Sequence, residues 1–404
     1  MSPVSPGPRP RLPSAVWWFG GTSFANDFAS EMVYPLLPAF VTRTLGGGAL
    51  ALGILDGVAD AIAAGFKLLS GYLAERPRLR GPMVVGGYAI AALVRPFIAA
   101  AAAAWHVIAL RAVDRLGKGV RTAPRDVMIA DATHPSMRGR AFGVHRGADH
   151  VGAIVGPLAA AALIAGGFAV RQVFWIAVVP GVAAAVLAAV AVRRAAAATT
   201  PAPDEPADPG PVEAALPRRG FAALVAVLAV AAFLRAPETL LILRAQDLGV
   251  AVAAVPLLWA ALHVVRSLSS YPGGALADRW GPRRTLAVGW LCYAVLAVLF
   301  ARAQGALQAW AVFLAFGIVA GLTESPERAL VAAMAGGSKR GRGFGWYHGA
   351  LSAVALPGAA FFGWMYQVLG GDVALRASAI VTLAAIILLG AVSLVPGSQP
   401  QAHG

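Results

Sequence analysis

The sequence predicts an all-α membrane protein, with twelve transmembrane helices arranged as two pseudo-symmetric six-helix bundles. Three observations support this fold class. Hydrophobic residues make up 58% of the 404 residues and charged residues only 13%, well below the share of about 25% that is usual in soluble domains. Apolar runs long enough to cross a bilayer recur along the chain. One segment pattern also occurs twice, once in each half.

The length of the apolar runs predicts the helix positions, because a spanning helix needs about 20 mostly apolar residues. The first run is too long and too acidic for a cleavable signal peptide, so it reads as a helix. The others follow in order, several of them interrupted by charges or prolines. The twelve predicted helices are 15–42, 50–74, 83–104, 105–129, 141–166, 172–192, 221–243, 253–277, 285–304, 308–333, 343–368 and 374–395.

The segments outside these helices complete the predicted domain organisation. Segment 193–220 is rich in proline and acidic residues and cannot build a core, so we expect a disordered cytoplasmic linker between the bundles. The expected parts are a cytoplasmic tail (1–14), the first bundle (15–192), this linker, the second bundle (221–395) and a second cytoplasmic tail (396–404).

The net charge of +14 has a topological explanation. Lys and Arg gather in every second connection, and cytoplasmic loops of membrane proteins carry such an excess. Both termini are therefore predicted on the cytoplasmic side of the inner (plasma) membrane. The charge does not indicate nucleic acid as a partner, because it is scattered between apolar runs.

An internal repeat relates the two halves. The segment from Thr122 to Ala148 matches the segment from Glu324 to Ala350 at a constant offset of 202 residues. A proline, an Arg-Gly-Arg block and a Phe-Gly pair are in register. A duplicated six-helix unit explains this match. Repeats of this kind place a binding site between the halves, near the middle of the membrane.

The repeated segments also resemble a known family. The stretch GALADRWGPRR, which begins at Gly274, is similar to the signature loop of the major facilitator superfamily, and Gly71 begins a degenerate copy. DRLGKGVRTAPRD resembles a functionally ill-defined prokaryotic branch, and Gly152-x-x-x-Gly156-Pro157 resembles a motif of the family's exporters. The resemblance implies alternating access without a cofactor, and it slightly favours export.

Acidic residues inside the membrane are the candidates for ion coupling. Asp27 and Glu31 lie four residues apart on one helical face, and so do Asp56 and Asp60. A carboxyl group in a low-dielectric cavity can take up and release a proton near neutral pH, so these four are the predicted proton carriers. The resemblance also favours Asp27 and Glu31. The alternative is that all four neutralise nearby Arg and Lys residues as structural pairs.

A wider set of polar and aromatic residues is expected on helices that line a central cavity. Charged groups at membrane depth are costly and usually face the bundle interior. Arg95 is expected to face a neighbouring helix or to snorkel. The predicted cavity residues are Tyr34, Arg111, Asp114, Arg115, Lys118, Arg146, Asp149, His150, Glu238, His263, Arg266, Trp346 and Tyr347.

A second cluster is predicted to form a cytoplasmic gate. Arg125-Asp126 and Glu327-Arg328 are equivalent in the repeat, with reversed charges, at the level of the signature loops. Arg76 is expected to pair with Asp126, and Asp278 or Arg279 with Arg328 or Glu327, as a latch that forms when the protein opens outward. Static anchoring is the alternative. The gate set is Gly71, Glu75, Arg76, Arg125, Asp126, Gly274, Asp278, Arg279, Glu327 and Arg328.

These features predict a monomeric secondary transporter that exports a small-molecule substrate in exchange for protons across the lipid bilayer. No cofactor or metal is expected, and no enzyme, because the chain has no P-loop, HExxH or paired CxxC motif. Three alternatives remain open: uptake of a nutrient, an organic anion or a metal ion or complex; a polytopic membrane enzyme; and a non-transporting sensor with the same fold.

Overall fold

The computed structural model describes residues 12–134, 137–198, 219–335 and 340–392, and every regular element among them is a helix. The first half contains α1 (Ser14–Val33), η1 (Tyr34–Leu36), α2 (Leu37–Ala39), η2 (Phe40–Thr44), α3 (Ala49–Leu73), α4 (Pro77–Val94), η3 (Arg95–Ala100), α5 (Ala104–Asp131), α6 (Arg138–Ala165), α7 (Val170–Ile176) and α8 (Val178–Ala198). The second half contains α9 (Arg219–Phe233), α10 (Glu238–Asp247), η5 (Val252–Ala254), α11 (Val255–Trp280), α12 (Pro282–Arg302), α13 (Ala306–Ala335), α14 (Arg340–Leu369) and α15 (Gly371–Val392).

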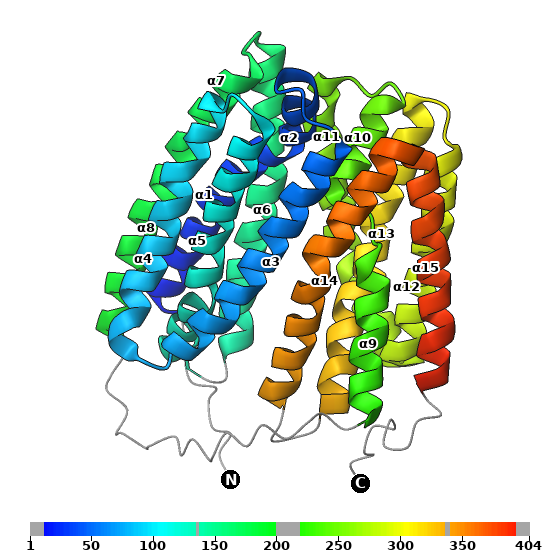
Figure 1. Ribbon diagram of the computed structural model, residues 1–404. Coiled ribbons are helices and arrows are strands. Elements are labelled where there is room, and N and C mark those ends of the chain that lie inside the picture. The colour runs from blue at the N-terminus through cyan, green and yellow to red at the C-terminus, as the bar shows by residue number, and fades with distance from the viewer. Residues whose placement is uncertain (1–11, 135–136, 199–218, 336–339, 393–404) are drawn as a thin grey trace, which may run out of the picture.

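The predicted all-α fold with two six-helix bundles is confirmed. Within the described residues, ten helical segments are long and apolar enough to cross a membrane. Two further rods run through the bundle beside them: α1 with its short continuations, and α5 (Figure 1). Composition alone does not identify these two rods as membrane-spanning, because they are too polar. The helix α5, for example, carries seven charged side chains between Arg111 and Asp126. Their burial among the other helices explains how such polar segments lie at membrane depth.

Prolines divide two of the rods into shorter helices. Pro35 and Pro38 interrupt the first rod, where it passes through a 3-10 turn and then a π-helical turn. The chain also breaks between α9 and α10, and Pro237 caps the start of α10. A proline cannot donate a backbone hydrogen bond, so the ladder is lost at these points. The second break leaves the first N–H groups of α10 free to bind a side chain from the other half.

Helix occupies both edges of the predicted linker. The sixth rod continues to Ala198, six residues beyond the expected end, and α9 begins at Arg219. The expectation of a disordered segment from 193 to 220 is therefore wrong at 193–198 and 219–220. An alanine-rich sequence explains the extension, because alanine has the highest helix propensity. Residues 199–218 lie outside the described part of the chain.

The hydrophobic core is shared at one end of the molecule only. We define the linker end as the end where α1 and α9 begin and α8 and α15 stop; the other end is the far end. At the far end, one cluster contains residues of both halves, among them Leu36, Phe40 and Trp259. At the linker end, each half has a core of its own. The bundles accordingly lean together at the far end and stand apart at the linker end (Figure 1).

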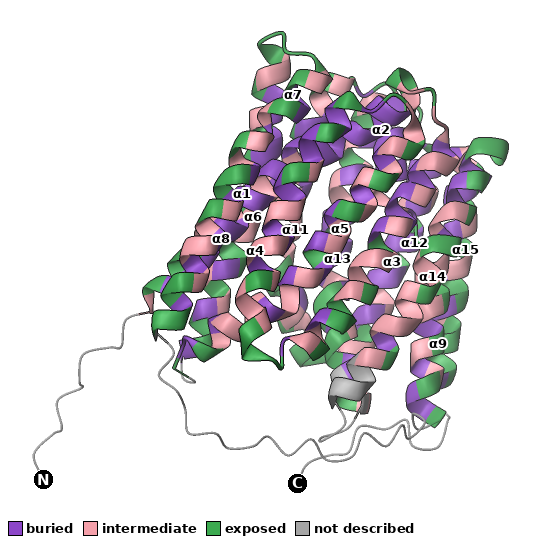
Figure 2. Cartoon of the chain, turned by 60° about the vertical axis from the view of Figure 1, so that its left-hand side comes forward, coloured by how far each residue is buried: buried purple, intermediate pink, exposed green. Residues whose placement is uncertain are grey.

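The outer surface of the helices is apolar. Large hydrophobic side chains such as Leu268, Ile380 and Ile387 are more than 60% exposed, whereas buried residues lie on the faces turned toward the other helices (Figure 2). Soluble proteins rarely expose so much apolar surface to water. This surface is the one expected to face lipid.

Glycines allow one close contact between the halves, where α3 crosses α14. A Cβ atom on Gly53 would lie 2.2 Å from the carbonyl oxygen of Ala359, whereas a Cβ atom on Gly65, further along the same helix, would meet nothing within 4 Å. Because glycine has no Cβ atom, the two backbones can touch at this crossing.

Replacing Gly53 by alanine is therefore expected to destabilise the protein by about 1–3 kcal/mol, because the helices must move apart. Gly65→Ala is the matched control and should leave stability unchanged or slightly raised. Thermal unfolding in detergent measures both. Equal midpoints for the two variants would contradict the close contact.

Candidate substrate-binding cavity

A cavity of about 710 Å³ lies between the two bundles, a size in the range of small-molecule sites. Helices from both halves contribute to it. The four predicted proton carriers line it, namely Asp27, Glu31, Asp56 and Asp60. So do ten of the predicted cavity residues, namely Tyr34, Arg111, Asp114, Arg115, Lys118, Asp149, His150, Glu238, His263 and Arg266.

Three predicted cavity residues lie elsewhere. Arg146 is exposed, and Trp346 is 53% exposed; neither lines the cavity. Tyr347 lies in a side pocket of about 310 Å³ within the second half, where its hydroxyl donates to Glu327 at 2.6 Å. Arg146 and Trp346 sit on helical faces next to cavity residues, and sequence spacing alone does not fix the rotation of a helix so finely.

The structure adds lining residues that the sequence did not single out for the cavity. The important ones are Asn26, Arg95, Arg121, Arg235 and Trp259. Trp259 precedes His263 by four residues on α11, so the helical period could have placed both on one face. Two partners of Asn26, Arg95 and Arg121, come from two other segments, η3 and α5, and no local pattern indicates them.

A fully buried charge network holds the first half together. Asp114 on α5 accepts a hydrogen bond from Arg95 Nε at 2.9 Å and one from Arg111 Nη1 at 3.3 Å. Arg95 also reaches the side-chain oxygen of Asn26 on α1 at 2.9 Å, and Arg121 donates to that oxygen at 3.1 Å. Asp114, Arg95 and Arg111 are each no more than 3% exposed. This network ties α1, η3 and α5 to one another, and none of these hydrogen bonds involves one of the four predicted proton carriers.

Asp56 on α3 makes a direct connection between the halves. Its Oδ2 atom accepts hydrogen bonds from the hydroxyl of Thr239 at 2.7 Å and from the backbone N–H of Thr239 at 3.2 Å. Its Oδ1 atom accepts one from the Tyr34 hydroxyl at 3.3 Å. Because Thr239 lies in the first turn of α10, the free N–H groups at that helix start also favour a negative charge here.

Glu31 makes the second connection. Its carboxylate accepts a hydrogen bond from the indole N–H of Trp259 at 2.8 Å, and His263 Nε2 lies 4.0 Å from the same oxygen. The ring of Trp259 also packs against Tyr34, with centroids 5.2 Å apart. Two acids of the first half are therefore bound by uncharged donors of the second half.

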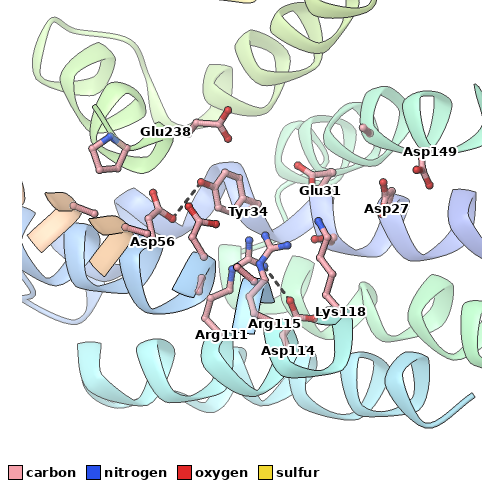
Figure 3. Close-up of a pocket in the computed structure, with 18 of the residues that line it drawn as sticks. Asp27, Glu31, Tyr34, Asp56, Arg111, Asp114, Arg115, Lys118, Asp149 and Glu238 are labelled. Carbon is pink, nitrogen blue, oxygen red and sulfur yellow. Dashed lines mark hydrogen bonds and ion pairs between the residues drawn. The ribbon is translucent and has the colours of Figure 1, made fainter. Parts of the chain in front are cut away.

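Two other acids of the cavity, Asp149 and Glu238, have partners within their own half. Asp149 accepts a hydrogen bond from Ser23 and lies 3.8 Å from His145 Nδ1. Glu238 and Arg266 form an ion pair at 2.6 Å. Figure 3 shows Arg111, Arg115 and Lys118 projecting from one helix toward Glu31, Tyr34 and Asp56 on the others. A positive wall thus faces an acidic one.

The predicted gate residues lie near the linker end, but the expected latches are absent from the described part of the chain. Asp126 pairs with its own neighbour, Arg125, at 2.8 Å instead of with Arg76. No ion pair among the described residues joins Asp278 or Arg279 to Glu327 or Arg328. The ion pair nearest this end is Arg80–Asp131, at 2.8 Å. Because the two cores are separate at the linker end, unformed latches agree with a conformation that is open there.

The described residues contain no group of three or more His, Cys, Asp or Glu side chains placed to hold a metal ion. The acids of the cavity are spread over several helices and are bound by hydrogen-bond donors of the protein. The cationic wall on α5 is suited to an anion.

The comparisons with known proteins agree with this architecture. The family model of the Major Facilitator Superfamily matches residues 19–264 and 223–403. An uncharacterized protein of Mycobacterium tuberculosis is 31% identical, with 94% of each chain covered. An uncharacterized MFS-type transporter of Methanocaldococcus jannaschii is 26% identical, covering 94% of this chain and 95% of its own length.

Two further similarities concern either a part of the chain or the fold alone. The multidrug resistance protein MdtH of Photorhabdus laumondii is 31% identical over 31% of each chain. A crystal structure of a bacterial homologue of the human lysosomal transporter Spinster superposes with a TM-score of 0.73 at 17% identity, covering 95% of this chain and 98% of the other, and shows that the fold is shared. The family-model matches together span most of the sequence, and this chain therefore belongs to the major facilitator superfamily of membrane transporters.

Proposed function

We propose that this protein exchanges protons for a small solute across the inner membrane, and that the solute moves outward. The observation that carries the proposal is the cavity between the two bundles, which is lined by all four predicted proton carriers and is closed at the far end by the shared core. Separate cores at the linker end leave access from that side. The clusters of Lys and Arg favour the cytoplasm for the linker end.

Alternating access follows from the arrangement of the cores. The shared cluster at the far end must divide for the cavity to open there, and the linker end must close in return. The charged residues Arg125, Asp126, Glu327 and Arg328 are proposed to pair across the linker end in that second state. The similarity of part of the chain to the multidrug resistance protein MdtH supports export.

Glu31 and Asp56 are proposed as the main coupling residues, with Asp27 and Asp60 beside them. Both carboxylates accept hydrogen bonds from the opposite half. A protonated carboxyl group is a weaker acceptor than a carboxylate, so proton binding weakens the closure at the far end. Protonation and the choice between the two conformations are linked in this way.

The test uses proteoliposomes with an imposed pH gradient and a panel of solutes, with a pH-sensitive dye inside the vesicles. A gradient equivalent to about 100 mV supplies about 2.3 kcal/mol per proton, enough for a roughly fifty-fold accumulation of solute. The wild type should reach such a gradient, and Glu31→Gln and Asp56→Asn should only equilibrate the solute. The same accumulation assay on Asp27→Asn measures how much Asp27 contributes to proton coupling.

Asp372→Asn is the matched control, because Asp372 is 39% exposed and pairs with Arg376 one helical turn away at the far end. It should transport as the wild type does. Accumulation that ignores the pH gradient in the wild type would refute proton coupling, and full accumulation by both Glu31→Gln and Asp56→Asn would refute their role.

A further inference from the structure

The wall of the cavity formed by α5 has more positive charge than its own acid can balance. Arg111, Arg115 and Lys118 follow one another at helical spacing and line the cavity. Asp114 is the acid of this wall, and it is shared between Arg95 and Arg111. Within the described residues, Arg115 and Lys118 have no ion pair of their own.

Arg111 is held rigidly in this wall. Its side chain is 3% exposed, its guanidinium carbon lies 4.8 Å from the centre of the Tyr34 ring, and its Nη1 atom donates to Asp114. Tyr34 is itself fixed by its hydrogen bond to Asp56. A guanidinium group that is stacked on a ring and bound at one end has little freedom left to turn.

The remaining two nitrogens of Arg111, Nε and Nη2, are buried and have no hydrogen-bond partner in the described structure. These two N–H groups lie on the same edge of the planar guanidinium and point in the same direction. Neighbouring protein atoms cover both in this conformation, so a ligand reaches the edge only when a side chain of the cavity wall moves aside. That edge matches the two oxygens of a carboxylate, which it binds through two parallel hydrogen bonds. Leaving a buried donor unpaired costs about 1–3 kcal/mol, so an arriving acceptor is strongly favoured here.

Three carboxylates that line the cavity are already bound by other groups of the protein. Asp56 is held by Thr239 and Tyr34, Glu31 by Trp259, and Glu238 by Arg266. None of these acids accepts a hydrogen bond from Nε or Nη2 of Arg111. The walls around the charged residues also contain many small alanines and the ring of Trp259, which leave room for an organic body.

We propose that the free edge of Arg111 binds a carboxylate group of the transported solute, and that the solute is an organic carboxylate. Nε of Arg115, also buried without a partner, supplies a third donor one turn along the helix. The identity of the site as a transport cavity rests on the proposed function, whereas binding of the carboxylate does not depend on the direction of transport or on protons.

The experiment measures binding to the full-length protein in lipid nanodiscs by calorimetry and by thermal shift. The probes are matched in shape: 3-phenylpropanoate against its amide and its alcohol, with acetate, glutarate and inorganic phosphate alongside. The wild type should bind 3-phenylpropanoate at least tenfold more tightly than the amide or the alcohol. Arg111→Lys keeps the positive charge beside Asp114 but loses the two-pronged edge, so it should weaken carboxylate binding at least tenfold.

Arg171→Lys is the matched control. Arg171 also stacks on an aromatic ring, at 5.0 Å from the centre of Phe40, but its N–H groups donate to the carbonyl oxygens of Ala99 and Ala101, away from the cavity. It should bind carboxylates as the wild type does, and a thermal unfolding midpoint near that of Arg111→Lys excludes a folding defect as the cause of lost binding.

Several results would overturn the proposal. They are equal binding of carboxylate and amide, unchanged carboxylate binding in Arg111→Lys, tighter binding of phosphate than of any carboxylate, and no carboxylate binding at millimolar concentration. Failure of proton coupling would appear only in the proteoliposome flux and would leave these affinities unchanged. The two proposals can therefore fail separately.

Discussion

Asp114→Asn is expected to destabilise the protein by about 3–5 kcal/mol. The amide keeps the shape of the carboxylate but removes the negative charge that Arg95 and Arg111 share. Both guanidinium groups would then be buried with nothing to balance them. The substitution weakens the contacts between α1, η3 and α5, all of which belong to the first bundle. The first bundle should therefore unfold before the second.

Thermal unfolding of the purified protein in a mild detergent measures this effect. Asp131→Asn is the matched control, because Asp131 pairs with Arg80 at a similar distance but is 40% exposed, and such pairs contribute less than about 1 kcal/mol. Adding Arg111→Gln to Asp114→Asn should restore part of the lost stability. If Asp114→Asn and Asp131→Asn unfold at the same temperature, Asp114 is not the centre of the first bundle.

Trp259→Ala is expected to open the far end of the cavity. The ring of Trp259 is buried, packs on Tyr34 and donates to Glu31, and both partners belong to the other half. Truncating a buried tryptophan costs about 3–5 kcal/mol in total. Some of the contacts of Trp259 lie within its own half and are kept in both conformations. The conformation closed at the far end should therefore lose about 2 kcal/mol relative to the open one, which shifts the equilibrium between them roughly thirty-fold.

Spin labels at the far end report this shift as a distance. Suitable positions are Thr44 in the first half and Gln304 in the second, both exposed, in a background with Cys292→Ser. Double electron–electron resonance should show a longer distance becoming dominant in Trp259→Ala. Trp105→Ala, at a tryptophan that is 65% exposed, should leave the distribution unchanged.

The two tryptophan variants separate the effect of packing from that of charge. Trp259→Phe keeps most of the ring but loses the N–H group that binds Glu31, so it should produce a smaller shift that depends on pH. If the distance distribution of Trp259→Ala equals that of the wild type, then the ring of Trp259 does not seal the far end.

The sequence was sufficient for the membrane class, the number of rods and most of their positions. Hydrophobic length alone placed α3 and α15 to within three residues. The repeat then divided the chain into halves and located a cavity between them. The acids were found because charge at membrane depth is rare, so each one stands out from an apolar background.

Other features could not be read from the chain. The breaks at Tyr34 and before Glu238 depend on how prolines are accommodated by neighbouring helices. Arg95 faces neighbouring helices, which is one of the two positions that the sequence allowed, but its partners Asn26 and Asp114 were not indicated by any pattern in the chain. The expected latches at Arg76 and Asp278 belong to a conformation other than this one under the proposed function.

The amino-acid sequence by itself determined that the chain is a duplicated bundle of membrane helices with buried charges, because hydrophobic length and repeat spacing are local properties that survive without a fold. Only the tertiary structure decided which charges balance one another and which remain available. Asp114 and Arg111 lie three residues apart, yet the bond that leaves one edge of Arg111 free depends on Arg95, Tyr34 and the packing of three helices. Pairing between distant segments is set by geometry, and no spacing along the chain encodes it.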